Sequence, residues 1–354
     1  MIDGSAGTGK TLVAISLLHY LKTHEHFKGK KIALVYAQTA MRDKIKSVAK
    51  HFNGLLAKDI ISPAKVTREK YDIVICDEAQ RLRRRVGYNK NNISIVKTNE
   101  RMGYDKDTDE LEWLLRNTQY QVLFYDSKQN VAPTDIDTDS FEERIGKTSQ
   151  EVRHSVRHVK LEEQMRIRAG DKFVPYIYNV LWQKTRRRIS FKNYEFKLFD
   201  SFSEMEAAIH EKEKSAGLSR LSGGYAWEWL TKNKDEKSDM NFDGIYVTWN
   251  SQTAGWIDNP DKKNEMGSIY TLGGMDLNYV GVAIGPDLVF NPDSKKVEVN
   301  RNEIYDHEIR MGKDVDEVLK YVINSYAVLL TRGIMGTFVY AHDKGLREYL
   351  RKFI

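Results

Sequence analysis

Residues 4–11 restrict the fold of this chain more than any other segment. They read Gly-Ser-Ala-Gly-Thr-Gly-Lys-Thr, a phosphate-binding loop of the form G-x-x-x-x-G-K-[ST]. Glycine lets the backbone turn tightly, so that successive N–H groups point at phosphate oxygens. The run from Thr11 to Tyr20 is apolar and helix-forming, so the start of a helix also faces the phosphates. The sequence therefore predicts an α/β fold that holds a nucleoside triphosphate.

Two residues of this loop carry specific chemistry. Lys10 supplies a positive charge at the β- and γ-phosphates, and the Thr11 hydroxyl is a ligand for Mg²⁺. Only residues 1–3 precede the loop, so the strand that leads into it is predicted to be truncated. The residues expected to hold the nucleotide are Gly4, Ser5, Ala6, Gly7, Thr8, Gly9, Lys10 and Thr11.

Composition excludes several classes of protein. The chain has 354 residues, of which 41% are hydrophobic, and this is enough for two domains. No apolar run approaches the roughly 18 residues of a membrane span, so no membrane partner is predicted. The single cysteine, Cys76, excludes an internal disulfide and agrees with a cytoplasmic location. The net charge of +6 permits a polyanionic partner without requiring one.

Strands and helices alternate in the first part of the chain. Such alternation implies parallel pairing in one sheet, where ligands bind at the carboxyl ends of the strands. The phosphate loop, Asp77 and Asp126 each follow a predicted strand, so we expect them at one edge. The strands are predicted at 31–37, 71–76 and 121–125, and the helices at 40–52 and 111–115.

A second unit of similar architecture is predicted to begin near residue 145. This gives one domain at 1–145 and another at 146–354. A capping box formed by Ser203 and Glu206 predicts the start of a helix. Further strands are predicted at 196–199, 244–249, 279–284 and 337–340, and a helix at 316–329.

Two carboxylates directly follow the buried run Tyr71 to Cys76. In this position Asp77 suits a Mg²⁺ ion that bridges the phosphates. Glu78 suits the activation of a water molecule for attack on the γ-phosphate. Because a small-molecule kinase does not need such a glutamate, the pair favours a hydrolase.

Three further polar residues are candidates for work at the γ-phosphate. Gln129 follows the strand at 121–125, where an amide can contact both the γ-phosphate and the attacking water. Arg166 and Arg332, in the second half, are candidates for neutralising the charge of the transferring phosphoryl group. The chain has 56 basic residues, so the residues alone leave open whether either arginine has this role.

The order of these motifs resembles that of superfamily 1 helicases, in which two RecA-like domains with mainly parallel sheets enclose one ATP. More narrowly, the stretches at 123–126, 275–282 and 326–340 resemble a bacterial family of P-loop proteins related to the helicase-like region of Schlafen proteins. The resemblance covers nearly the whole chain. It implies an ATPase that uses ATP and Mg²⁺ and acts on single-stranded DNA or RNA. Some members are fused to a nuclease, so a fused or associated nuclease is a further candidate partner.

The resemblance also assigns roles to individual residues. Gln129 corresponds to the γ-phosphate sensor, and Arg166 and Arg332 correspond to two arginine fingers. A segment that couples the nucleotide to nucleic acid corresponds to Thr271, Gly274 and Asp276, with Gly274 near the nucleotide and Thr271 near the strand. Thr39 corresponds to a residue that contacts the phosphates of a single strand.

The chain departs from the family pattern in three respects. Gly273 stands where glutamine is common, which weakens the expected coupling between ATP and the strand. The upstream glutamine motif that contacts adenine is absent, and so are the large inserted subdomains of processive enzymes. Trp249 follows a predicted strand and is a candidate for stacking on a base.

Two functions from different classes fit these observations. The first is an ATP-hydrolysing motor, a helicase or translocase on single-stranded nucleic acid. The alternative is a regulatory or scaffold module in which the bound nucleotide controls a fused or separate effector without unwinding. The pair Asp77-Glu78 and both arginines favour an active ATPase, whereas Gly273 and the missing insertions disfavour a full helicase.

Overall fold

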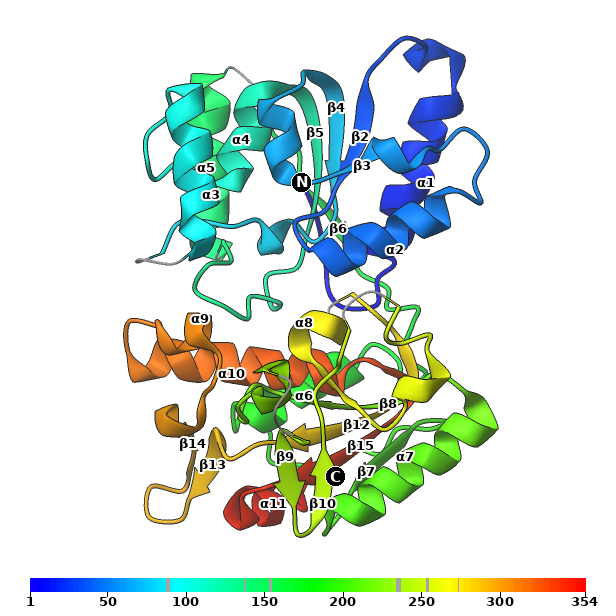
Figure 1. The fold of residues 1–354 in the computed structure, drawn as a ribbon, viewed down its shortest axis with the longest axis vertical. Coiled ribbons are helices and arrows are strands. Elements are labelled where there is room, and N and C mark those ends of the chain that lie inside the picture. Colours follow the sequence, from blue (N-terminus) through cyan, green and yellow to red (C-terminus); the bar gives the residue numbers. More distant parts are fainter. Residues whose placement is uncertain (87–89, 137, 153–154, 234–236, 253–254, 273) are drawn as a thin grey trace. The chain divides into compact units, whose positions relative to one another are not determined.

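The structure is a computed structural model that describes residues 1–86, 90–136, 138–152, 155–233, 237–252, 255–272 and 274–354 (Figure 1). The chain divides into two compact units, Met1–Glu163 (unit 1) and Gln164–Ile354 (unit 2). This boundary lies later than the predicted one at 145/146. The reason is that helix α5 (Thr138–Glu151) packs on α4 (Glu110–Asn117), and strand β6 (Val159–Leu161) pairs with β1 (Ile2–Gly4).

Unit 1 contains, among the described residues, a six-stranded sheet in the order β3-β2-β4-β5-β1-β6. Each neighbouring pair is parallel, as the alternation of strands and helices predicts. The other strands are β2 (Ile32–Val35), β3 (Ile60–Ile61), β4 (Tyr71–Cys76) and β5 (Thr118–Tyr125). The other helices are α1 (Lys10–Thr23), α2 (Thr39–Ala49) and α3 (Lys90–Met102), with short 3-10 helices η1 (Glu25–Phe27), η2 (Ala57–Asp59), η3 (Pro63–Thr67) and η4 (Ala79–Arg81).

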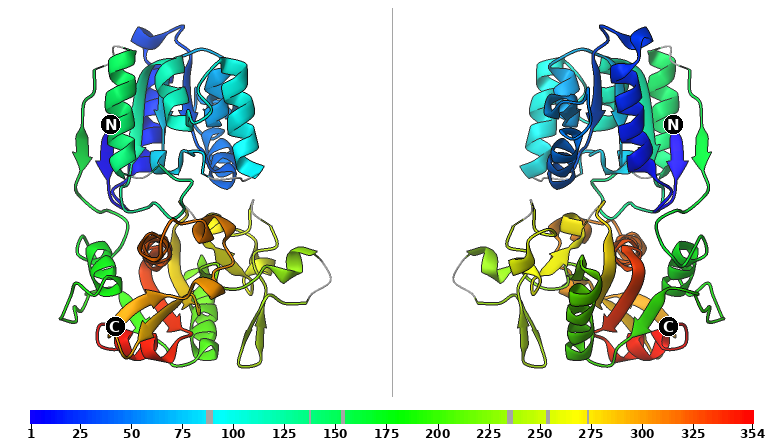
Figure 2. Two further views of the ribbon diagram at one scale, coloured as in Figure 1. Left: turned by 90° about the vertical axis from the view of Figure 1, so that its left-hand side faces the viewer. Right: turned by 90° about the vertical axis from the view of Figure 1, so that its right-hand side faces the viewer.

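Alternate residues of the central strand β4 face opposite helical layers. Ile73 and Ile75 belong to a core cluster shared with α1 and α2, whereas Val74 and Cys76 belong to one shared with α4 and α5. The ribbon views show these helices on opposite faces of the sheet (Figures 1 and 2). The carboxyl ends of β1, β5 and β4, which are neighbours in the sheet, therefore lie together at one end of the strands.

Unit 2 contains, in its described part, a five-stranded parallel sheet in the order β11-β8-β12-β15-β7. Its strands are β7 (Glu195–Leu198), β8 (Ser219–Gly223), β11 (Met266–Ser268), β12 (Leu277–Ile284) and β15 (Gly333–Ala341). Two antiparallel hairpins accompany the sheet, β9 (Met240–Phe242) with β10 (Ile245–Val247) and β13 (Leu288–Asn291) with β14 (Lys296–Val299). The helices are α6 (Phe173–Leu181), α7 (Phe202–Ala216), α8 (Ile269–Leu272), α9 (His307–Arg310), α10 (Val315–Leu330) and α11 (Lys344–Leu350), with η5 (Leu230–Asn233), η6 (Pro260–Lys262) and η7 (Arg301–Glu303).

Two predicted elements of unit 2 need correction. Helix α7 begins at Phe202 and is capped by Ser201, whose hydroxyl accepts a hydrogen bond from the N–H of Glu204 at 3.2 Å. The predicted capping box at Ser203 is therefore wrong by two positions. The predicted strand at 244–249 is shortened to β10, which belongs to a hairpin and lies outside the parallel sheet. Among the described residues, no helix combines the length and the apolar character that crossing a bilayer requires.

Candidate functional site

The phosphate loop joins β1 to α1 in unit 1, and its glycines are required by the backbone. Gly7 and Gly9 have φ values of 85° and 81°, in the left-handed region that favours glycine. At Gly4 an added Cβ atom would lie 2.5 Å from the hydroxyl oxygen of Thr8, so a larger residue does not fit. The first N–H groups of α1 have no acceptor within the helix and are directed toward the loop. The loop thus has the conformation that presents main-chain donors to an anion.

Lys10 is held at the centre of this loop. Its side chain is 5% exposed, and its ammonium group donates to the carbonyl oxygens of Gly4 at 2.6 Å and Ser5 at 3.0 Å. It also forms an ion pair of 3.5 Å with Asp126, which follows β5. The cation is therefore positioned before any ligand binds, which lowers the cost of ordering it around a triphosphate.

A pair of oxygen ligands for a divalent cation lies at the start of α1 and the end of β4. The Thr11 hydroxyl donates to the Asp77 carboxylate at 2.6 Å, and the hydroxyl of Tyr36 donates to the same oxygen at 2.8 Å. Hard oxygen donors and a single close carboxylate suit Mg²⁺, which takes most of its other ligands from water and phosphate. Asp77 is fully buried, and this burial, followed by the nearby charge of Glu78, raises its pKa to about 6.

Glu78 lies beside this pair in an unusual backbone conformation. Its φ and ψ are 52° and 45°, which is uncommon for a residue with a side chain. Two contacts hold it there. Its N–H donates to the Asp77 carboxylate at 3.0 Å, and its own carboxylate accepts a hydrogen bond from the Gln80 side-chain amide. The Glu78 side chain is partly exposed, so water can reach it.

Asp126 connects the ends of β4 and β5 to the phosphate loop. Its N–H donates to the side-chain oxygen of Gln80 at 3.1 Å, and its carboxylate accepts from Gln129 at 2.6 Å as well as from Lys10. Gln129 is 4% exposed. The residues predicted for phosphate binding, metal binding and water activation in unit 1 are thus joined in one network.

The sequence assigns no role to Tyr36 or Gln80 and predicts only the location of Asp126. Tyr36 and Gln80 contact the predicted site residues directly, and Asp126 is the hub between them. The contact of Tyr36 depends on the pairing of β2 with β4, in which Val35 lies opposite Cys76. A polar residue at the end of a strand, the signal that places Asp126 at this edge, would also have found Tyr36.

In unit 2 the structure gathers the predicted arginines at the amino ends of β12 and β15. The guanidinium of Arg166 forms an ion pair with Asp276 at 2.8 Å and donates to the carbonyl oxygen of Thr331 at 3.0 Å. Arg332 follows Thr331 and is 3% exposed, and its carbonyl accepts from the N–H of Leu277 at 3.1 Å. Three predicted motifs that are far apart in sequence therefore meet at one corner of unit 2.

The residues predicted to touch nucleic acid have different surroundings. Thr39, at the start of α2, is exposed, and its hydroxyl accepts a hydrogen bond from Arg42 at 3.0 Å. Thr271 is 4% exposed, with its hydroxyl 3.0 Å from that of Ser268. Direct contact between Thr271 and a strand would need α8 to move.

The prediction for Trp249 needs correction. Its side chain is completely buried, in ring contact with Tyr225 and Trp227, so no face is open to a base. The apolar run before it forms part of a hairpin and carries the indole into the core. Gly274 occupies a turn with a φ of 77° ahead of β12. The substituted position Gly273 lies outside the described residues.

Comparison with known families now identifies the group. Residues 1–343 match the model of the family described as Schlafen group 3, DNA/RNA helicase domain. The chain belongs to this family. Membership covers both units and agrees with the mixed α/β fold and its parallel sheets.

One curated relative of this Schlafen group 3 helicase domain matches over part of its length. A Saccharomyces cerevisiae protein, "Uncharacterized protein YPL245W", is 34% identical over 171 residues, which cover 45% of this chain and 37% of the yeast protein. The chain thus spans well under half of that relative. Since the relative is from yeast, the predicted restriction to bacteria is not supported.

Solved helicase structures give weaker matches. The arterivirus nonstructural protein 10 (helicase) is 11% identical with a TM-score of 0.42, over 96% of this chain and 58% of that chain. The Pif1 helicase from Candida albicans is 12% identical with a TM-score of 0.35, over 98% of this chain and 92% of that chain.

Proposed function

We propose that this chain is a Mg²⁺-dependent ATPase that acts on single-stranded nucleic acid, as a helicase or translocase. The observation that carries the proposal is the network of unit 1, in which the phosphate loop, the pair Asp77-Glu78 and Gln129 are joined through Gln80 and Asp126. Membership in a DNA/RNA helicase domain family supports the same conclusion.

The residues of unit 1 divide the work between binding and hydrolysis. The loop N–H groups and Lys10 bind the β- and γ-phosphates, and Thr11 and Asp77 would hold Mg²⁺, which would neutralise phosphate charge. The Glu78 carboxylate accepts a proton from water as the water oxygen attacks the γ-phosphorus. The bond from the γ-phosphorus to the bridging oxygen breaks, so that ADP and phosphate leave and the proton passes from Glu78 to solvent or phosphate. Gln129 orients the water, and Gln80 keeps the Glu78 side chain in place.

Arg166 and Arg332 are proposed to stabilise the charge that develops on the transferring phosphoryl group. Arg166 is held by Asp276, a residue of the segment proposed to couple nucleotide and strand. For Arg166 to reach a phosphate, it must exchange this carboxylate for the new anion. The Arg166–Asp276 ion pair would therefore link nucleic-acid binding at the coupling segment to the movement of Arg166 toward the phosphate.

The decisive experiment measures ATP hydrolysis in the presence and absence of single-stranded DNA or RNA. The proposal expects Mg²⁺-dependent hydrolysis that a single strand stimulates, with a stimulation that falls as salt rises. No hydrolysis by a folded protein that binds ATP would overturn the enzymatic part. Hydrolysis without any binding of nucleic acid would overturn the motor.

One observation favours a second function. Thr271 and Trp249, two of the three residues predicted to touch nucleic acid, are buried. This favours a nucleotide-controlled module that acts on an effector such as an associated nuclease. Its signature is ATP-dependent binding of the effector together with ATPase activity that no nucleic acid changes.

A further inference from the structure

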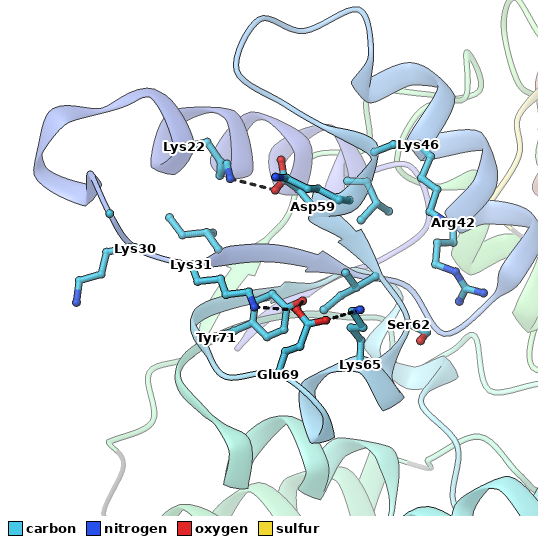
Figure 3. Close-up of a pocket in the computed structure, with 16 residues that line it drawn as sticks. Lys22, Lys30, Lys31, Arg42, Lys46, Asp59, Ser62, Lys65, Glu69 and Tyr71 are labelled. Atoms are coloured by element: carbon cyan, nitrogen blue, oxygen red, sulfur yellow. Dashed lines mark hydrogen bonds and ion pairs between the residues drawn. The ribbon is translucent and has the colours of Figure 1, made fainter.

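A basic groove lies along the edge strand β3 of unit 1, away from the phosphate loop (Figure 3). It encloses about 790 Å³. Seven lysine or arginine side chains line it against two carboxylates, Asp59 and Glu69, so an excess of five positive charges faces one cavity. We call this feature the basic groove.

The short length of β3 creates the groove. Ile60 and Ile61 pair only with Leu34 and Val35, so no described strand covers the first half of β2 on this side. The gap runs from Arg42 and Ser62, near the carboxyl ends of β2 and β3, to Lys31 and Tyr71, at the amino ends of β2 and β4. The result is an elongated channel and not a closed pocket.

The two carboxylates position part of the positive charge. Asp59 is 3.0 Å from Lys22, and Glu69 accepts from Lys31 at 2.8 Å and also pairs with Lys65 (Figure 3). The hydrogen bonds from Lys31 and Lys65 lower the pKa of Glu69 to about 2. Lys30 and Lys46 also pair with carboxylates outside the lining, Asp72 at 3.2 Å and Asp43 at 3.5 Å. Seven cations against these four carboxylates leave a local excess of three positive charges, and exposed ion pairs of this kind are weak enough to open toward an external anion.

Arg42 joins the groove to two residues already described. It donates to the carbonyl oxygen of Tyr36 and to the hydroxyl of Thr39, each at 3.0 Å. Both acceptors are neutral, so the charge of Arg42 is not cancelled by them. Thr39 is the exposed residue predicted to contact strand phosphates, and the groove continues from it along the sheet edge.

We propose that the basic groove is a second anion site, which binds the phosphodiester backbone of the nucleic acid strand that reaches Thr39. The proposal rests on the proposed function in naming nucleic acid as the ligand. An extended polyanion fits better than a small phosphate compound, because the lining reaches from the amino to the carboxyl end of β2 and three of its lysines, Lys30, Lys31 and Lys65, are half-exposed on flexible stems. Contacts of this kind position a strand and do not distinguish its sequence.

The test compares two charge-reversal variants of the full chain. The groove variant carries Lys46→Glu and Lys58→Glu, in α2 and η2. The matched control carries Lys97→Glu and Lys147→Glu, exposed positions in α3 and α5 on the opposite face of the sheet. Both variants change the net charge equally. Binding of a labelled single-stranded oligonucleotide is measured over a salt series, together with basal ATPase activity and the melting temperature.

The groove variant is expected to bind about tenfold or more weakly at low salt, with a shallower salt dependence by about one to two units of slope. The control should stay within about threefold of the parent, and both should keep basal ATPase activity. Inorganic polyphosphate should displace the oligonucleotide from the parent. Equal oligonucleotide affinity of the two variants would refute the groove as a nucleic-acid site and leave the proposed ATPase function untouched. A parent that hydrolyses ATP but binds no oligonucleotide would overturn the groove and the motor together, whereas oligonucleotide binding without ATPase activity would overturn only the enzyme.

Discussion

Unit 1 has two regions suited to anions, and they differ in almost every physical respect. The network around the phosphate loop places Lys10 and Asp77 in the interior, with exposed fractions of 5% and 0%. The basic groove places its cations on the surface, where the side chains of Lys30, Lys31 and Lys65 are 45–51% exposed. One region is a fixed network of hydrogen bonds around a main-chain loop, and the other is a row of flexible side chains.

Under the two proposals, this difference would let one fold separate specific from general recognition of phosphate. Buried, prepositioned groups interact strongly and resist screening by salt, so they suit one ligand of fixed shape. Exposed lysines interact weakly and adapt to a chain of phosphates, so they suit a polymer and respond steeply to salt. Each of the following predictions tests whether the two regions are as independent and as different as this comparison states.

The largest effect is expected from Lys10→Ala. Removing the buried ammonium leaves the phosphates and Asp126 without their cation, so affinity for ATP should fall about a hundredfold or more. Binding of an oligonucleotide should change little, which is the reverse of the groove variant. Isothermal titration with ATP and with the oligonucleotide checks both. If the Lys10→Ala variant and the groove variant each lower the affinity for ATP and for the oligonucleotide to the same extent, the two regions are not separate sites.

The next effect concerns Glu78→Gln. The amide keeps the size of the side chain but cannot accept a proton, so turnover should fall by about 10²–10⁴-fold while ATP affinity changes by less than about threefold. Glu69→Gln in the groove removes a carboxylate from the same unit and should leave turnover intact. Single-turnover kinetics at saturating ATP measures both variants. Parental turnover in Glu78→Gln would contradict the assignment of the base.

A smaller effect follows from the pH dependence of stability. The pKa of Asp77 is about 6 in the folded chain against 3.8 for an ordinary aspartate, so the folded state holds this proton more tightly than the unfolded state. Its contribution to the free energy of unfolding therefore decreases as pH rises from about 4 to about 6, by up to about 3 kcal/mol. Urea denaturation of the parent and of Asp77→Asn, without Mg²⁺, should show the parent losing stability relative to the variant as the pH rises across this window. A constant difference would show that Asp77 is not the titrating group.

The smallest effect is an expected gain. Glu69 has a pKa of about 2 and stays ionised at any working pH, so it always competes with an external anion for Lys31 and Lys65. Glu69→Gln should release these lysines and tighten oligonucleotide binding severalfold at low salt, an advantage that disappears at high salt. Fluorescence anisotropy at two salt concentrations decides this. Weaker binding would mean that Glu69 helps to shape the groove instead of blocking it.

The sequence could predict that the phosphate loop, Asp77 and Asp126 lie together, because each directly follows a strand of one parallel sheet. The segment 4–11 and the pair Asp77-Glu78 lie where strand ends and main-chain geometry require them. Tyr36 and Gln80 could not be predicted, since their contacts depend on which strands are neighbours and in what register. The interpretation of Trp249 failed for a related reason, because a short apolar run does not reveal whether it joins the sheet or a hairpin.

The division of the chain into units at 163/164, and not at the predicted 145/146, follows from long-range pairing. The predicted end at 145 follows from composition along the chain, whereas β6 returns to pair with β1 at the far end of unit 1. The basic groove could not be predicted from the sequence for the same reason. Its lysines come from several separate segments, and only the short pairing of β3 brings them to one edge.

The short length of β3 also affects how readily the protein would aggregate. An uncovered sheet edge offers main-chain hydrogen bonds to a strand of another molecule, which is a route to aggregation. The basic groove lies on this side of the sheet, where the pairing of β2 with β3 ends, so two copies that approach each other along it meet like charges. Substituting the lysines of the basic groove with alanine or leucine would therefore weaken nucleic-acid binding and would also remove the charge repulsion that opposes self-association through this side of unit 1.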